Sequence, residues 1–264
     1  METFDSEKAL IQIYRDTPSS HVYYYGRRLP CLRIRWLTKS RLFSKSWTDS
    51  SGKDVLPPDF HNDKHGVMME VMRIDDCINT LDGKEISNSF KRTNDYMNKY
   101  FGKGYKKRLN GSLFFVPDTR NNKEYNFEGY FNNFREVLMK HSDKVVMYRK
   151  NYPKCNNVIL FVFDESNCYV QATDDADLRR ERPQSITIAH NCFADSKFLE
   201  VIKSVQADYV IWFGFYKVLF HKGRRVRLPR ACIYDVKHMN ENGYIYDHRK
   251  MIKIIDEETS KYTK

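Results

Sequence analysis

The chain has 264 residues, of which 41% are hydrophobic and 14% aromatic, and this composition predicts a folded protein with a packed core. Its 45 Lys and Arg residues against 34 Asp and Glu residues give a formal net charge of +11, which favours an anionic partner such as nucleic acid. A polar, acidic start and the lack of a long apolar run argue against a signal peptide and a membrane span. We therefore expect a cytoplasmic protein with no membrane partner.

The six cysteines are scattered and form no CxxC pair, so the sequence gives no sign of a thiolate zinc site. Reduced and mostly buried thiols are the simpler interpretation.

The first quarter of the chain predicts a helix followed by a basic strand. Residues 5–15 place apolar side chains at helical spacing. From residue 21 to residue 45 apolar and basic residues alternate, and the segment 31–37 predicts a strand with one basic face. Arg33 and Arg35 lie on that face and are candidate nucleic-acid-binding residues.

A nearly continuous apolar run over residues 67–74 follows a proline-rich loop and predicts a buried strand. Glu70 and Arg73 are the two charged side chains inside this run. Buried charges cost several kcal/mol unless they are paired or bind a metal, so each needs a partner. An ion pair and a functional role are both compatible with the pattern.

The rest of the chain predicts alternating helices and strands. In chain order these are a polar helix over 87–101, a short strand over 113–116, a long helix over 127–150, a buried strand over 158–163 with 168–171 as its candidate hairpin partner, a strand over 186–189, a helix capped by Asp195, and an aromatic strand over 208–220.

Buried strands between amphipathic helices predict the α/β class in a mixed α+β form, with a central mixed β-sheet flanked by helices. No linker rich in Gly, Pro or Ser marks a domain boundary, so we expect a single globular domain over residues 1–264. A division into an N-terminal subdomain (1–110) and a core (111–255) is the alternative. The polar tail over 256–264 is expected to fray.

A basic hairpin is predicted around Lys222 and Gly223. Six Lys and Arg residues and no acidic residue lie between Asp208 and Asp235, as expected for a surface that binds phosphate. Its candidate nucleic-acid-binding residues are Lys222, Arg224, Arg225 and Arg227.

Acidic residues stand at the ends of several apolar strands. Two or three carboxylates brought together can hold Mg²⁺, and a nearby lysine can stabilise negative charge that develops on a phosphate. In Asp235-Val236-Lys237, an apolar segment ends in an acid and a lysine two residues apart. A solvent-facing pair on an edge strand would give the same pattern.

The triplet resembles the second half-motif of the PD-(D/E)XK nuclease superfamily, restriction-endonuclease-like enzymes with an acid and an acid-x-lysine triplet on a mixed sheet. The resemblance implies that Asp164, Asp208 and Asp235 bind Mg²⁺ or Mn²⁺, with Lys237 assisting the attacking water.

An alternative set within the same resemblance begins at the Pro58-Asp59 pair, eleven residues before Glu70. Position 72 is Met where the family has Lys, so Arg73 would have to substitute for that lysine. Asp59, Glu70 and Arg73 are therefore the alternative site residues.

The leading hypothesis is a metal-dependent nuclease, or a nuclease-like protein, that acts on DNA or RNA through a basic groove. The alternative is a non-catalytic protein that binds nucleic acid or a nucleoprotein machine. A surface that docks an acidic protein partner is a third interpretation of the same charge.

Overall fold

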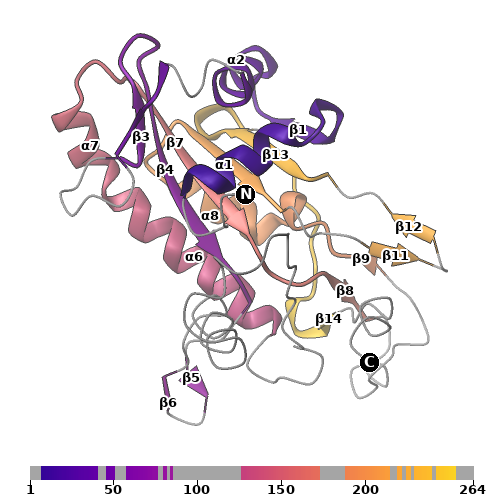
Figure 1. Ribbon diagram of the computed structural model, residues 1–264. Coiled ribbons are helices and arrows are strands. Elements are labelled where there is room, and N and C mark those ends of the chain that lie inside the picture. Colours follow the sequence, from indigo (N-terminus) through magenta and orange to yellow (C-terminus); the bar gives the residue numbers. More distant parts are fainter. Residues whose placement is uncertain are drawn as a thin grey trace, which may run out of the picture.

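A computed structural model describes the chain in separate segments (Figure 1). The described residues are 7–40, 46–50, 58–76, 80–81, 84–85, 126–172, 188–214, 219–221, 224–226, 229–239 and 242–253. The helix predicted over 87–101 and the strand predicted over 113–116 lie outside these residues, as does the polar tail.

A seven-stranded mixed sheet forms the centre of the structure, in the order β1-β13-β10-β7-β4-β3-β2. The strands are β1 (Val22–Tyr25), β2 (Thr48–Asp49), β3 (Phe60–Asn62), β4 (Val67–Ile74), β7 (Asn157–Asp164), β10 (Tyr209–Phe213) and β13 (Ala231–Asp235). The three central strands β4, β7 and β10 are parallel to one another. On one side β3 and β2 continue as an antiparallel meander, and on the other β13 is antiparallel to β10 and parallel to β1. The predicted mixed α/β class is confirmed.

Helices cover both faces of this sheet (Figure 1). On one face lie α1 (Glu7–Asp16) and α2 (Arg28–Lys39), and on the other lie α6 (Phe127–Asp143), α7 (Val145–Asn151) and α8 (Ser196–Ser204). Successive strand residues point to opposite faces, so each strand contributes to two cores. In β4, for example, Met69 packs with α1 and α2, whereas Met68 packs with α6 and α8. This arrangement explains why β4 and β7 have almost unbroken apolar sequences.

The segment 31–37 is helical, and the prediction of a basic strand there is wrong. It belongs to α2, in which Cys31, Ile34 and Thr38 are buried at a spacing of three and four residues. Pro30 falls in the first turn of this helix, where the missing backbone N–H would have no helical partner. Arg33 and Arg35 therefore lie on a helix.

The long helix predicted over 127–150 is present but divided at Lys144. The Asn126 side chain caps its start by accepting a hydrogen bond from Gly129 N at 2.8 Å. At the division, Lys144 N bonds to His141 O, three residues back, and this tighter turn separates α6 from α7. The division places Lys144 at the end of α6.

Segment 168–171 contains β8 (Tyr169–Gln171), but the predicted hairpin with β7 is wrong. β8 lies in a separate three-stranded sheet between β14 (Met251–Lys253) and β9 (Ile188–Ala189). The predicted aromatic strand over 208–220 is present as β10, which ends at Phe213, and as β11 (Leu219–His221). β11 pairs with β12 (Arg224–Val226) in the predicted hairpin.

The remaining strands are β5 (Thr80–Leu81) and β6 (Lys84–Glu85), which pair with each other. Four short 3₁₀ turns are also described: η1 (Ser19–His21), η3 (Cys192–Ala194), η4 (Val236–His238) and η5 (His248–Lys250). None of the helices in the described ranges combines the length and apolar character needed to cross a membrane.

Candidate functional site

Asp164, the first of the predicted metal ligands, is a fully buried residue at the end of β7. Its Oδ2 accepts hydrogen bonds from Tyr130 Oη at 2.7 Å and from Trp212 Nε1 at 2.9 Å. Its Oδ1 accepts bonds from the backbone N and the Oγ of Ser166 at 2.9 and 2.6 Å. Protein groups therefore donate two hydrogen bonds to each oxygen of this carboxylate, which takes the place of metal coordination.

Asp208 and Asp235 lie at the opposite end of the sheet from Asp164. Asp208 N bonds to Val158 O, six residues before Asp164 on β7, which is a separation of roughly 20 Å along the strand. Asp208 bonds to Arg149 of α7 and to Val158 N.

Asp235 bonds instead to Arg27, directly before α2, at 2.9 Å. The Asp235 and Asp208 side chains thus lie on opposite faces of the sheet, and the three predicted ligands do not share a metal ion.

Asp235 and Lys237 also do not form an acid-x-lysine pair on one strand. β13 ends at Asp235, and Lys237 is an exposed residue of the 3₁₀ turn η4. The side chain that reaches Asp235 from this turn is His238, whose Nδ1 lies 2.9 Å from Asp235 Oδ1. Burial opposes ionisation of Asp235, but the hydrogen bonds of Arg27 and His238 outweigh it and lower its pKa.

The alternative pair, Asp59 and Glu70, is brought together. Phe60 pairs with Met69 in the β3–β4 register, so the next residues along, Asp59 and Glu70, are neighbours across the two strands. Asp59 is anchored through its Oδ2, which accepts a hydrogen bond from Val71 N at 2.7 Å. Two carboxylates eleven residues apart in the sequence thus meet near the middle of β4.

The surroundings of Asp59 and Glu70 shift the pKa values of the two carboxyl groups in opposite directions. Burial and the neighbouring Glu70 carboxylate raise the pKa of Asp59 to about 7. For Glu70, burial favours the neutral form, but hydrogen bonds from His141, Lys144 and Tyr148 dominate and lower its pKa. Carboxyl groups with pKa values driven apart are typical of acid–base sites, although structural ion pairs produce the same effect.

Lys144 and His141 complete this cluster from the far end of α6. Lys144 Nζ lies 2.9 Å and His141 Nδ1 lies 2.8 Å from the same atom, Glu70 Oε1. The Glu70 side chain is only 5% exposed, whereas that of Lys144 is 29% exposed. A lysine thus reaches the carboxylate pair from a helix. Arg73, the predicted substitute for the missing lysine, instead points to Glu165, with its Nη1 3.5 Å from Glu165 Oε1.

A pocket of about 300 Å³ lies next to the Asp59–Glu70 pair. It lies where β4 extends past the end of β3 and forms the edge of the sheet. It is lined by residues of α1, β4 and α6, namely Glu7, Leu10, Val71, Met72, Arg73, Val137, Lys140 and His141. The Glu7 carboxylate also contributes to the raised pKa of Asp59. Sequence reasoning missed Glu7, His141 and Lys144, because each comes from a helix whose position against β4 is set only by the fold.

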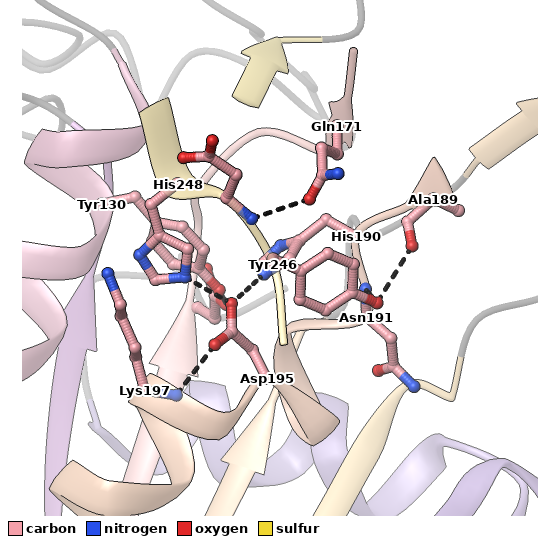
Figure 2. Close-up of polar contacts among 11 residues, drawn as sticks. Tyr130, Gln171, Ala189, His190, Asn191, Asp195, Lys197, Tyr246 and His248 are labelled. Atoms are coloured by element: carbon pink, nitrogen blue, oxygen red, sulfur yellow. Dashed lines mark hydrogen bonds and ion pairs between the residues drawn. The ribbon is translucent and has the colours of Figure 1, made fainter. Parts of the chain in front are cut away.

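A second polar cluster lies near the start of α6 and centres on Asp195, the N-cap of α8 (Figure 2). Asp195 Oδ2 accepts hydrogen bonds from His190 Nε2 at 2.8 Å and from His248 Nε2 at 2.7 Å. Its Oδ1 accepts a bond from Lys197 N at 2.9 Å. Burial opposes the charge on Asp195, but the two histidines outweigh it and lower its pKa to about 2. The cluster links the start of α8 to His190, which directly follows β9, and to His248 of η5.

The predicted nucleic-acid-binding residues fall into two groups. Arg33 is exposed on α2, and the Arg35 guanidinium lies over the Tyr24 ring at 5.7 Å. Lys222 and Arg227 lie outside the described residues, and so do the side chains of Arg224 and Arg225 on β12.

Within the described ranges, no three His, Cys, Asp or Glu residues are arranged to hold a metal ion. The Asp59–Glu70 pair offers two carboxylates, and this donor set fits Mg²⁺ or Mn²⁺, which keep several water ligands, better than a zinc site made wholly of protein ligands. Comparisons with protein families, curated proteins and solved structures find no match to this chain.

Proposed function

We propose that this protein is a metal-dependent phosphodiesterase acting on DNA or RNA, with its active site at Asp59, Glu70 and Lys144. The observation that carries the proposal is the meeting of two carboxylates across β3 and β4 with a lysine 2.9 Å from one of them. In the acid-x-lysine resemblance the lysine follows the second acid on its own strand. Here Met72 occupies that position, and Lys144 supplies an ammonium group to the same carboxylate from α6.

Each residue has a role that follows from its surroundings. Asp59 and Glu70 would hold the metal ion. Burial and then the Glu70 carboxylate raise the pKa of Asp59, and a bound cation would offset both effects. A bound Mg²⁺ or Mn²⁺ ion supplies charge neutralisation at phosphate and a water of lowered pKa. Lys144 would stabilise negative charge on the reacting phosphate. A pocket lined by Val71 and by His141, the partner of Glu70, lies beside these residues and would be the approach for a phosphate group.

A non-catalytic protein that binds nucleic acid is the second candidate, and one observation favours it. Glu70 already has three hydrogen-bonding partners, Lys144, His141 and Tyr148, and a buried acid satisfied in this way is also a common structural arrangement. Under this alternative the protein binds without cleaving.

The two candidates are separated by incubating the protein with plasmid DNA, a single-stranded oligonucleotide and RNA, in Mg²⁺, Mn²⁺ or EDTA. We expect cleavage that requires the divalent ion. Asp59→Asn, Glu70→Gln and Lys144→Met should each lower the cleavage rate by about 100-fold or more, because each removes charge at the reacting centre.

Matched controls come from the same chain. Lys150→Met removes an exposed lysine of α7, and Lys237→Ala removes the exposed lysine of the Asp235-Val236-Lys237 triplet, so both variants should keep nearly full cleavage. Circular dichroism of every variant checks the fold. Cleavage that survives Glu70→Gln but disappears in Lys237→Ala would refute the assignment, and binding without cleavage in all metals would leave the second candidate.

A further inference from the structure

The outer face of α2 carries cationic and aromatic side chains that the proposed active site does not use. The α2 sequence contains three arginines and one lysine and no acidic residue. Leu29, Arg33 and Trp36 follow one another at intervals of four and three residues and therefore form one stripe along the helix. Leu29 is 79% and Trp36 54% exposed. Arg28 and the half-buried Arg35 lie together on one side of the stripe, and we call these five residues the α2 face.

The apolar side of the helix is already occupied. Cys31, Ile34 and Leu37 are buried against the core formed with α1 and one face of the sheet. Lys39 is also turned inward, where its ammonium group donates hydrogen bonds to Tyr14 O and Thr17 O. The packing of α2 on the core therefore uses the opposite side of the helix from Leu29, Arg33 and Trp36.

The α2 face is supported by neighbouring elements. The Trp36 ring lies edge-on to His65 of the β3–β4 turn, with ring centroids 6.0 Å apart, and Arg33 approaches the backbone oxygen of His65 at 3.4 Å. Arg35 lies over the Tyr24 ring of β1. Contacts to two separate elements, the β3–β4 turn and β1, limit the movement of these side chains, which lowers the entropy cost of binding a ligand.

We propose that the α2 face binds single-stranded nucleic acid, with an unpaired base stacked on Trp36 and the arginines contacting phosphates. Surfaces of this kind combine a cationic track with aromatic rings, and an exposed indole ring can stack on a base only where the base is unpaired. The inference rests on the nucleic-acid partner of the proposed function and deepens it by naming the strand form. It does not depend on cleavage at Asp59 and Glu70.

The composition of the α2 face favours nucleic acid over an anionic membrane. A helix that lies in a membrane surface buries a continuous apolar side in the lipid, whereas the apolar side of α2 packs inside the protein. What remains outside is one leucine and one tryptophan separated by arginines. That pattern suits alternating bases and phosphates.

Tryptophan fluorescence gives a direct test, because Trp36 is the exposed tryptophan while Trp47 and Trp212 are buried. The wild-type protein is titrated with a fifteen-nucleotide oligothymidylate and with a duplex of equal length, in EDTA so that metal-dependent cleavage does not interfere. We expect single strands to quench the emission and the duplex to bind more weakly. Trp36→Ala should remove the quenching and weaken single-strand binding by about 5- to 100-fold, with Trp36→Phe in between.

Two exposed residues elsewhere provide controls. Tyr244→Ala removes a 63% exposed aromatic ring, and Arg249→Ala removes an arginine whose side chain is 89% exposed. Both variants should bind as the wild type does. Absence of quenching by single strands, unchanged affinity in Trp36→Ala, or quenching only by anionic lipid vesicles would each overturn the inference. Binding through Trp36 without any cleavage would instead overturn the proposed hydrolysis alone.

Discussion

Glu165 is the first residue after β7, and its environment favours the neutral acid. Burial raises the pKa of its side chain to about 7, despite Arg73 at 3.5 Å, and the nearby Asp75 and Asp164 act in the same direction as burial. An unfolded chain ionises this group near pH 4.3. The unfolded state therefore binds fewer protons than the folded state between about pH 4.3 and 7, and stability falls as the pH rises through this window.

Glu165→Gln keeps the shape and remains neutral at every pH. We expect it to raise the free energy of unfolding above pH 7 by about 2 kcal/mol relative to the wild type, with little difference at pH 4. Urea unfolding at pH 4 and pH 8 measures the effect. Glu200→Gln on the exposed side of α8 is the control, and a wild-type stability that rises between pH 5 and 7 more than that of the variant would contradict the prediction.

Sequence reasoning identified part of the candidate site at this scale. The Pro58-Asp59 pair and the acid inside an apolar strand pointed to Asp59 and Glu70, and β3 and β4 bring them together. Lys144 could not be found in the same way, because it lies 74 residues from Glu70 and approaches it from a helix end. The interpretation of Asp235-Val236-Lys237 as a site required the strand to continue through Lys237, but β13 ends at Asp235.

At the scale of elements, the Asp195 cluster links the start of α8 to the nearby His190, five residues before Asp195, and to the distant His248, 53 residues after it. One buried carboxylate caps the helix through Lys197 N and accepts hydrogen bonds from His190 and His248 (Figure 2). Because its pKa is lowered to about 2 in the fold, its contribution to stability is complete above about pH 4 and disappears as the pH falls toward 2.

Asp195→Asn should lower the free energy of unfolding at pH 7 by about 2–3 kcal/mol, because the amide group can accept fewer of the three hydrogen bonds and carries no charge. Asn126→Ala, which removes a simple cap from α6, should cost about 1 kcal/mol. Chemical unfolding at pH 7 and pH 3 provides the measurement. Equal losses in the two variants would show that the histidines add nothing to the cap.

Elements with a clear periodic pattern were predicted from sequence, and elements with two compatible patterns were not. The apolar runs of β4 and β7 and the amphipathic helices α6 and α8 appear where the sequence placed them. In α2 the arginines at 33 and 35 alternate with apolar residues, which is the pattern of a strand. The segment is nevertheless helical, because a helix packs its buried residues against α1 and the sheet. β8 pairs with strands from the C-terminal part of the chain, which no local pattern reveals.

At the scale of the whole molecule, the sheet topology decides which acids can act together. The strands run so that Asp164 and Asp208 stand at opposite ends of the parallel β7–β10 pair. The meander of β2, β3 and β4 instead places Asp59 beside Glu70. Helix α6 packs on the face of the sheet to which Glu70 points, and Lys144 at its end contacts Glu70. Strand order and direction are set by long-range packing. The sequence therefore identifies the acidic residues at strand ends but does not show which of them lie close together.

The net charge of +11 predicts how binding responds to salt. Each phosphate contact on a single strand releases counterions and contributes about −0.7 to the slope of log K against log salt concentration. Contacts by Arg28, Arg33 and Arg35 alone therefore give a slope near −2, which is about a 20-fold loss of affinity between 50 and 200 mM salt. Fluorescence anisotropy with a labelled oligonucleotide measures this slope. Arg33→Ala should make it shallower by about 0.7 and Arg249→Ala should leave it unchanged, whereas a flat response in the wild type would mean that the basic surface does not contact phosphate.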